Sequence, residues 1–153
     1  MTYNSYLILD EKTALMDTVD ARKMQEWEQN LQEALGGRNM DYLVISHLEP
    51  DHAGSIARLL ELYPDTALVG NAKTFQMLPQ FFDITEHDER VVVKEGDTLS
   101  LGSHTLNFYM APMVHWPEVM VTYESSEKIL FSADGFGKFG AMDAKDDEGW
   151  ACE

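Results

Sequence analysis

The spacing of hydrophobic residues changes along this chain, from strand-like to helical and back again. Apolar runs at 3–9 and 14–17 flank the polar segment Asp10-Glu11-Lys12, which predicts a β-hairpin at the start of the chain. From 21 to 35 the apolar residues recur every three or four positions, and Gly36 follows directly. This spacing predicts an amphipathic helix closed by a glycine cap.

The rest of the chain continues as alternating elements and then becomes mostly β. A short apolar run at 42–45 predicts a strand buried on both faces, and a helical stripe follows at 56–63. A strand at 67–69 and a short helix near 74–78 come next. Further strands are expected at 91–93, 98–101, 105–110, 119–123 and 129–131. We therefore predict an α/β (α+β) fold, and, since no repeat or linker divides the chain, one domain over residues 1–153.

Charge and cysteine content narrow the functional classes. Eleven basic and 27 acidic residues give a formal charge of −16, which argues against nucleic acid and anionic membranes as partners. No apolar run is long enough for a membrane span, and no signal-peptide pattern opens the chain. The single cysteine, Cys152, excludes an internal disulfide and favours a reducing compartment. We expect a cytoplasmic protein. The acidic stretch 143–153 is typical of a helix start.

Side chains that bind metals follow three of the predicted strands. They are His47, Glu49, Asp51 and His52 after the strand at 42–45, His115 after the strand at 105–110, and Asp134 after the strand at 129–131. Loops at the ends of strands often meet at one edge of a sheet, where functional groups collect. We therefore expect one joint site.

The spacing within the first cluster suggests two metal ions. In an extended segment, His47 and Glu49 would hold one ion, while Asp51 and His52 would hold the other. Asp134 has two oxygens that can bridge the ions, and His115 would complete the first ion. The second ion is left one ligand short.

Charge balance supports this hypothesis. Three carboxylates and one bridging hydroxide neutralise two divalent ions, which makes burial of the site tolerable. The remaining histidines, His87 and His104, lie among polar turn residues and are expected at the surface. The segment Gly135-Phe-Gly-Lys-Phe-Gly140 matches a dinucleotide-binding pattern, but the chain lacks the acid that should follow about 20 residues on. We expect these glycines to shape the loop beside Asp134.

The run His47-Leu48-Glu49-Pro50-Asp51-His52, with His115 and Asp134 in their local sequences, closely resembles the diiron domain of flavodiiron proteins, also called A-type flavoproteins. The resemblance covers essentially the whole chain. It implies a truncated metallo-β-lactamase-like αββα sandwich that reduces dioxygen to water or nitric oxide to nitrous oxide. By position, His47, Glu49 and His115 would bind one iron, Asp51 and His52 the other, and Asp134 would bridge the two. Glu49 is the distinguishing residue, because zinc hydrolases of the superfamily usually have histidine there, and a carboxylate favours iron.

The resemblance also implies partners beyond this chain. Family members take a last ligand of the second iron from a later histidine, and no histidine follows His115 here. They receive electrons from a flavodoxin-like domain that binds FMN, or from a rubredoxin-type donor, and pair as head-to-tail homodimers. We expect this chain to be an internal portion of such a protein, with FMN bound outside it. Two alternatives are a dinuclear zinc hydrolase and an inactive fragment with an incomplete metal site.

Overall fold

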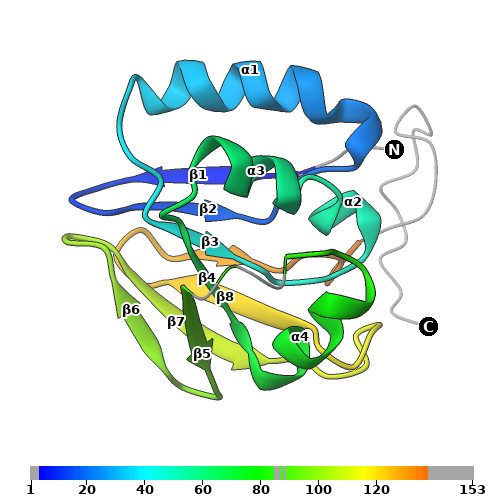
Figure 1. The fold of residues 1–153 in the computed structure, drawn as a ribbon. Coiled ribbons are helices and arrows are strands. Elements are labelled where there is room, and N and C mark those ends of the chain that lie inside the picture. Colours follow the sequence, from blue (N-terminus) through cyan, green and yellow to red (C-terminus); the bar gives the residue numbers. More distant parts are fainter. Residues whose placement is uncertain (1–3, 85–86, 88, 138–153) are drawn as a thin grey trace, which may run out of the picture.

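The computed structural model describes residues 4–84, 87 and 89–137, which form two β-sheets packed face to face with helices on one side (Figure 1). Cys152, Gly140 and the helix predicted from residue 143 lie outside these residues. The predicted mixed fold with two sheets is confirmed, and the elements follow the predicted order.

The first sheet combines the predicted hairpin with parallel strands in the order β1-β2-β3-β4-β5. Its strands are β1 (Tyr6–Leu9), β2 (Thr13–Met16), β3 (Tyr42–Val44), β4 (Ala67–Asn71) and β5 (Arg90–Val93). Strand β1 pairs antiparallel with β2, as expected of a hairpin, whereas the later neighbours all pair in parallel. Strands β2 to β5 therefore end at the same edge of the sheet.

The second sheet is an antiparallel meander in the order β6-β7-β8-β9. Its strands are β6 (Thr98–Ser100), β7 (Thr105–Met110), β8 (Met120–Glu124) and β9 (Ile129–Phe131). Each strand pairs with the next along the chain. Short turns suffice for such connections, in agreement with the turn residues between these apolar runs.

The helices are short except for the first. They are α1 (Met24–Leu35), α2 (Pro50–Ala53), α3 (Ile56–Leu62) and α4 (Ala72–Met77), with 3-10 turns at Ala21–Lys23 and Leu78–Gln80. The predicted helix over 21–35 therefore begins as a 3-10 turn, because the Asp20 side chain accepts a hydrogen bond from the backbone of Arg22. It ends as predicted, with Gly36 in the left-handed conformation.

Two hydrophobic layers hold the elements together, one on each face of the first sheet. Leu15, Leu43 and Leu68 are register partners that face the helices α1 and α3. The alternate residues Val44 and Val69 face the second sheet. Since adjacent residues of a strand point to opposite faces, this pattern confirms that β3 is buried on both sides.

One local prediction was wrong, and it concerns the metal-ligand cluster. The segment from His47 to His52 was expected to be extended throughout, but Pro50–Ala53 forms the helical turn α2. Glu49 is extended and Pro50 occupies the first helical turn, where its fixed φ and missing N–H are favourable. Gly54 follows this turn, and its Cα lies so close to the backbone that an added Cβ would be 2.6 Å from the carbonyl oxygen of Pro50. Asp51 and His52 are therefore presented by a helical turn.

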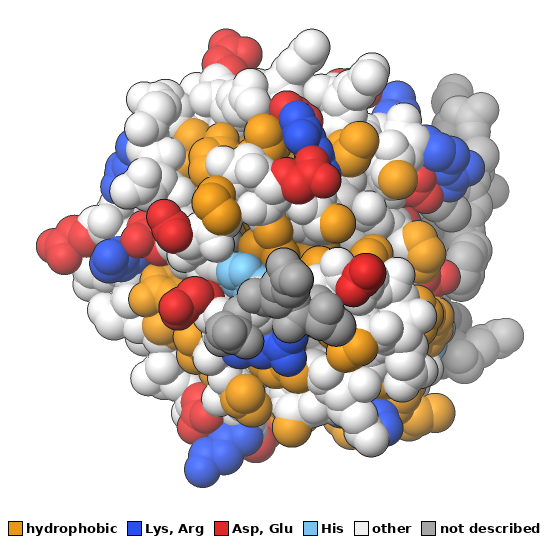
Figure 2. All heavy atoms as spheres, in the orientation of Figure 1, with side chains coloured by type: hydrophobic (Ala, Val, Ile, Leu, Met, Phe, Trp, Pro, Cys, Tyr) orange, Lys and Arg blue, Asp and Glu red, His pale blue; other side chains and the backbone are white. Residues whose placement is uncertain are grey.

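Acidic and basic side chains are interspersed on the face seen in Figure 2, with apolar side chains between them. Arg58, for example, pairs with Glu28 and Glu61. Among the helices of the described residues, none is long and apolar enough to cross a membrane.

Candidate metal centre

Four predicted ligands converge at one point beyond the end of β3. The Nε2 atom of His47 lies 3.3 Å from Oε2 of Glu49 and 3.5 Å from Oδ2 of Asp134. The Nε2 atom of His115 lies 2.9 Å from the same Glu49 oxygen and 3.3 Å from the same Asp134 oxygen. Ligand atoms about 2.0–2.2 Å from a shared metal are themselves about 3–3.5 Å apart. This first group therefore has the spacing of a metal-binding set.

A second group lies beside the first. His52 Nε2 is 2.9 Å from Oδ1 of Asp134 and 3.8 Å from Oδ2 of Asp51. Asp51, His52 and Asp134 each offer one ligand atom within 4.8 Å of the others. Asp134 turns one oxygen to each group, so a single carboxylate joins the two. The division of residues between the groups is the one expected from the sequence.

Strand ends and tight turns bring these residues together. His47 follows β3 closely, at the edge where the parallel strands end. Asp134 lies in two overlapping turns, closed by hydrogen bonds from Gly135 N to Ser132 O and from Gly137 N to Asp134 O. An added Cβ at Gly135 would lie 2.9 Å from the Ser132 oxygen. In the described part of the glycine pattern, residues 135–137 form a turn beside Asp134 and do not open a helix.

The two groups differ in exposure. The side chains of His47 and His52 are 0% and 10% exposed, whereas those of His115 and Glu49 are 55% and 37% exposed. The first group is therefore open to solvent on the side of His115 and Glu49. The Trp116 ring packs against the His47 ring in a T-shaped arrangement at a centroid distance of 5.1 Å.

The carboxylates and histidines of the site shift one another's pKa values. Burial lowers the pKa of His52, but the carboxylates of Asp17 and Asp134 outweigh it and raise the pKa to about 9. Burial raises the pKa of Asp134, but His52 and the neighbouring histidines outweigh it and lower that pKa overall. His52 therefore carries a proton at neutral pH without metal, and a metal ion binding at Nε2 must displace it.

The donor set fits transition-metal ions. The Oδ1 atom of Asp51 is buried and has no hydrogen-bond partner among the described residues, as expected of an atom whose partner is a cation. Imidazole nitrogens mixed with carboxylate oxygens suit iron better than magnesium or calcium, which prefer oxygen alone. The second group provides three protein ligands within the described residues.

Two buried carboxylates behind the histidines were missed by the sequence reasoning. Glu118 Oε1 lies 2.8 Å from Nδ1 of His47, and Asp17 Oδ2 lies 3.4 Å from Nδ1 of His52. Asp17 follows β2, at the edge where β3 also ends, so its position after a strand was a usable signal. Glu118 lies in the loop before β8, and nothing in its local sequence indicated a role. Its partner His47 is 71 positions away in the sequence.

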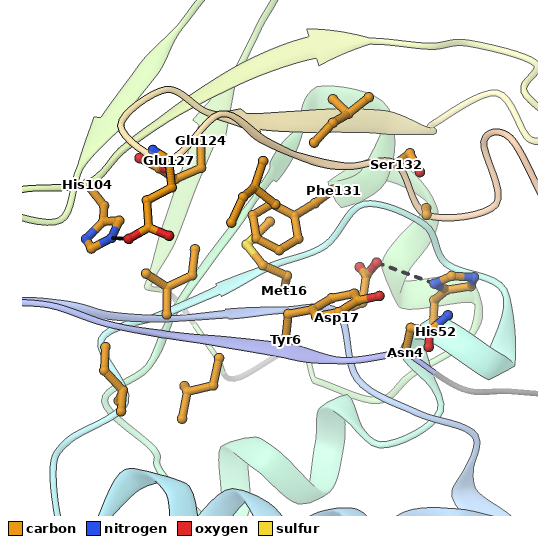
Figure 3. A pocket seen from close by; sticks show the side chains of 16 residues that line it. Asn4, Tyr6, Met16, Asp17, His52, His104, Glu124, Glu127, Phe131 and Ser132 are labelled. Atoms are coloured by element: carbon orange, nitrogen blue, oxygen red, sulfur yellow. Dashed lines mark hydrogen bonds and ion pairs between the residues drawn. The ribbon is translucent and has the colours of Figure 1, made fainter.

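A cavity of about 520 Å³ opens between β1 and β9, beside the second group. Figure 3 shows Tyr6, Met16 and Phe131 in its middle, with His52 and Asp17 at one end. His104 lies at the other end. It was expected at the surface, but it is half-buried and hydrogen-bonded to Asp10. His87 is half-buried as well.

The two packed sheets and the paired ligand groups define a metal-site domain of the metallo-β-lactamase type. Residues 1–149 match the family described as "ODP family beta lactamase", and the chain belongs to this family. Residues over 96% of the chain are 38% identical to the nitric oxide reductase of Moorella thermoacetica, of which they cover 37%.

Solved structures agree with this assignment. The flavodiiron protein from Giardia intestinalis superposes with a TM-score of 0.84 at 32% identity, over 92% of this chain and 34% of that one. The rubredoxin oxygen:oxidoreductase of Desulfovibrio gigas gives a TM-score of 0.80 at 39% identity, over 85% of this chain and 32% of that one. The resemblance to flavodiiron proteins is confirmed. The chain spans between 25% and 37% of the length of the curated relatives it matches.

Proposed function

We propose that this chain is the diiron portion of a flavodiiron-type oxidoreductase, which reduces dioxygen to water or nitric oxide to nitrous oxide. The observation that carries the proposal is the pair of ligand groups joined by Asp134, with a carboxylate, Glu49, in the first group. In this proposal residues 1–153 form one partial domain. The names of the relatives support the reaction class, since one is a nitric oxide reductase and another a rubredoxin oxygen:oxidoreductase.

The proposed ligands form the same two groups that the distances between their ligand atoms define. His47, Glu49 and His115 hold the first iron, Asp51 and His52 hold the second, and Asp134 bridges them. The Nε2 atoms of the histidines lie together with one oxygen each of Glu49 and Asp51 and with both oxygens of Asp134. The carboxylates offset the charge of two ferrous ions, which lowers the cost of holding both near the protein core.

Bound iron would pass electrons from a donor to the substrate and would offer it open coordination positions. The chain's own residues position the metals and control access. Glu49 and His115 leave the first position open to solvent, so a small neutral molecule can approach there. The Trp116 ring packs against the rings of His47 and His115 beside the first group.

The proposed reaction needs an electron donor, because the metal-ligating side chains do not supply electrons. We propose a flavodoxin-like domain carrying FMN as the donor, or a rubredoxin-type protein, as the name of the Desulfovibrio gigas relative suggests. We also propose that the protein is cytoplasmic and that it forms a head-to-tail homodimer. This dimer would bring the flavin of one subunit near the irons of the other.

The function is tested by loading the chain with ferrous iron without oxygen and counting bound ions by elemental analysis. We expect two irons per chain, the second bound more weakly because its group has three protein ligands within the described residues, against four in the first group. Mössbauer spectra should show two coupled iron environments. Exposure of the loaded chain to nitric oxide should then yield nitrous oxide, measured by gas chromatography, as both ferrous ions are oxidised.

The matched control replaces Asp65 with Asn, since Asp65 is an exposed acid away from the site and should not change either result. Two zinc ions bound in preference to iron, together with ester hydrolysis, would instead favour the dinuclear hydrolase. Binding of at most one ion would favour the incomplete-site alternative.

A further inference from the structure

The buried histidine of the first group has a partner on each side of its ring. Its Nε2 atom faces Glu49 and Asp134, and its Nδ1 atom lies 2.8 Å from Oε1 of Glu118. The side chains of His47 and Glu118 are both 0% exposed. No water competes for the Nδ1 contact, so the ring orientation depends on the carboxylate behind it.

Glu118 is itself held in place from two directions. Its Oε1 atom accepts a second hydrogen bond from the backbone N–H of Leu48, at 2.9 Å. Its backbone carbonyl accepts a hydrogen bond of 2.7 Å from the side chain of Asn71, at the end of β4. Its Oε2 atom is buried without a hydrogen-bond partner among the described residues. Within the part of the chain that the structure describes, the hydrogen bonds of the carboxylate therefore involve Oε1.

This arrangement selects one tautomer of His47. An oxygen that already accepts the Leu48 N–H accepts a second N–H from Nδ1 of the ring. The ring proton then sits on Nδ1, and Nε2 keeps its lone pair toward the first group. A histidine must present such a lone pair to bind a metal, and a partner on the other nitrogen commonly fixes the tautomer and the ring orientation.

Asp17 stands in a similar relation to His52, at a longer distance. Figure 3 marks its contact with Nδ1 of His52, 3.4 Å from Oδ2, while Oδ1 accepts a 2.7 Å hydrogen bond from the backbone N–H of Ser46. Each buried histidine of the site thus has a carboxylate anchored to the backbone behind its ring. The shorter contact and complete burial single out Glu118.

We propose that Glu118 is a positioning residue that fixes the tautomer and orientation of His47 and thereby strengthens metal binding at the first group. The effect on metal binding rests on the proposed metal site, whereas the effect on the tautomer belongs to the metal-free protein. Glu118 touches neither a metal position nor a substrate, so it acts through His47.

The first test is which ring nitrogen of His47 carries the proton in the metal-free chain, read from nitrogen-15 NMR of histidine-labelled protein. We expect the proton on Nδ1 in the wild type, and signals of both tautomers in Glu118→Leu. Glu118→Gln should retain the wild-type tautomer, because the amide oxygen accepts the same two N–H groups. A wild-type His47 with its proton on Nε2 would overturn the proposal without any variant.

The second test is metal affinity, measured by competition with a chelator for ferrous iron and for zinc. Loss of such a second partner typically weakens binding about 10–100-fold, and we expect this loss in Glu118→Leu and a smaller one in Glu118→Gln. The matched control is Glu124, which is equally buried and also accepts backbone N–H groups, from Ser126 and Glu127.

The outcomes separate this inference from the proposed function. Equal losses of metal affinity in Glu118→Leu and Glu124→Leu would mean that the substitutions destabilise the fold in general. Equal losses of metal affinity in Glu118→Leu and Glu118→Gln would mean that hydrogen-bond acceptance is not the cause. Either result would overturn the positioning role. If the chain prefers zinc to iron, the proposed function fails while the order of the variants stands. If it binds no metal, the tautomer measurement still decides what Glu118 does to His47.

Discussion

Oδ1 of Asp134 lies 2.9 Å from Nε2 of His52, although the two residues are 82 positions apart in the chain. The other oxygen of Asp134 lies 3.3 Å from Nε2 of His115, in the first ligand group. One short side chain, in the turn after β9, therefore links two groups whose other members follow β3 and β7. In the proposed two-metal site this carboxylate is the bridge.

Replacing Asp134 with Asn is expected to halve the number of bound iron ions, from two to one. The amide offers one neutral oxygen where the carboxylate offers two charged ones, and of the described residues the second position would keep Asp51 and His52. The first position would keep Glu49 and its two histidines. Anaerobic iron titration with elemental analysis measures the change. Two tightly bound irons in this variant would contradict the bridging role.

Glu49→His is expected to shift metal preference from iron toward zinc, because it replaces a hard oxygen ligand with a third imidazole in the first group. The measurement is the ratio of bound iron to bound zinc after incubation with equal amounts of both ions without oxygen. Glu33→His is the control, since Glu33 is an exposed residue of α1. An unchanged ratio would refute the carboxylate argument for iron.

Phe108→Ala is expected to destabilise the fold by about 3–5 kcal/mol, because it leaves a cavity between the two sheets. Phe108 is 0% exposed and packs against residues of both sheets. Its neighbour Tyr109 points to the other face of β7 and is 42% exposed. Tyr109→Ala should cost less than about 1 kcal/mol. Urea unfolding of the two variants tests the difference, and similar losses would contradict the assigned packing.

The contact between His104 and Asp10 joins the β1–β2 turn to the β6–β7 turn, and it should make stability depend on pH. The Asp10 side chain raises the pKa of His104, and the His104 backbone N–H is the main cause that holds the pKa of Asp10 well below its ordinary value. Glu124 and Glu127 also raise the pKa of His104.

The signs of these shifts define the pH window. The contribution of charged His104 is complete below its ordinary pKa of about 6.5 and is lost as pH rises through the higher folded value. The contribution of Asp10 is complete above about 4 and is lost on acidification toward its lower folded value. We expect His104→Asn to cost more stability near about pH 5.5 than near pH 9. Denaturant unfolding at both pH values checks this, and an equal cost at both would exclude the ionic contribution.

Much of the fold was predictable because its signals are local. The burial of β3 followed from its continuous apolar run, and the end of α1 followed from Gly36, which adopts the left-handed conformation. The prediction of an extended segment around Pro50 was wrong, and the reason was also local. Proline favours the first turn of a helix, and the prediction weighed the spacing of the ligands above that preference.

The candidate site was predictable in its residue types and in their division into two groups. Histidines and carboxylates are common metal ligands, and a cluster of them after a predicted strand stands out in the sequence. Glu118 did not stand out, because its role depends on a contact with His47 across 71 positions. His104 was assigned to the surface for the same reason, since its partner Asp10 is 94 positions away.

The sequence by itself determined most strands and helices, their order and the candidate ligands that follow them, Asp134 as a bridge included, since hydrophobic period and side-chain chemistry are properties of neighbouring residues. Only the tertiary structure decided that α2 is helical and that Glu118 and Asp17 stand behind His47 and His52. These relationships depend on how the two sheets pack and where their loops meet. Packing of that kind is set by the whole core at once, so no single segment of the chain contains it.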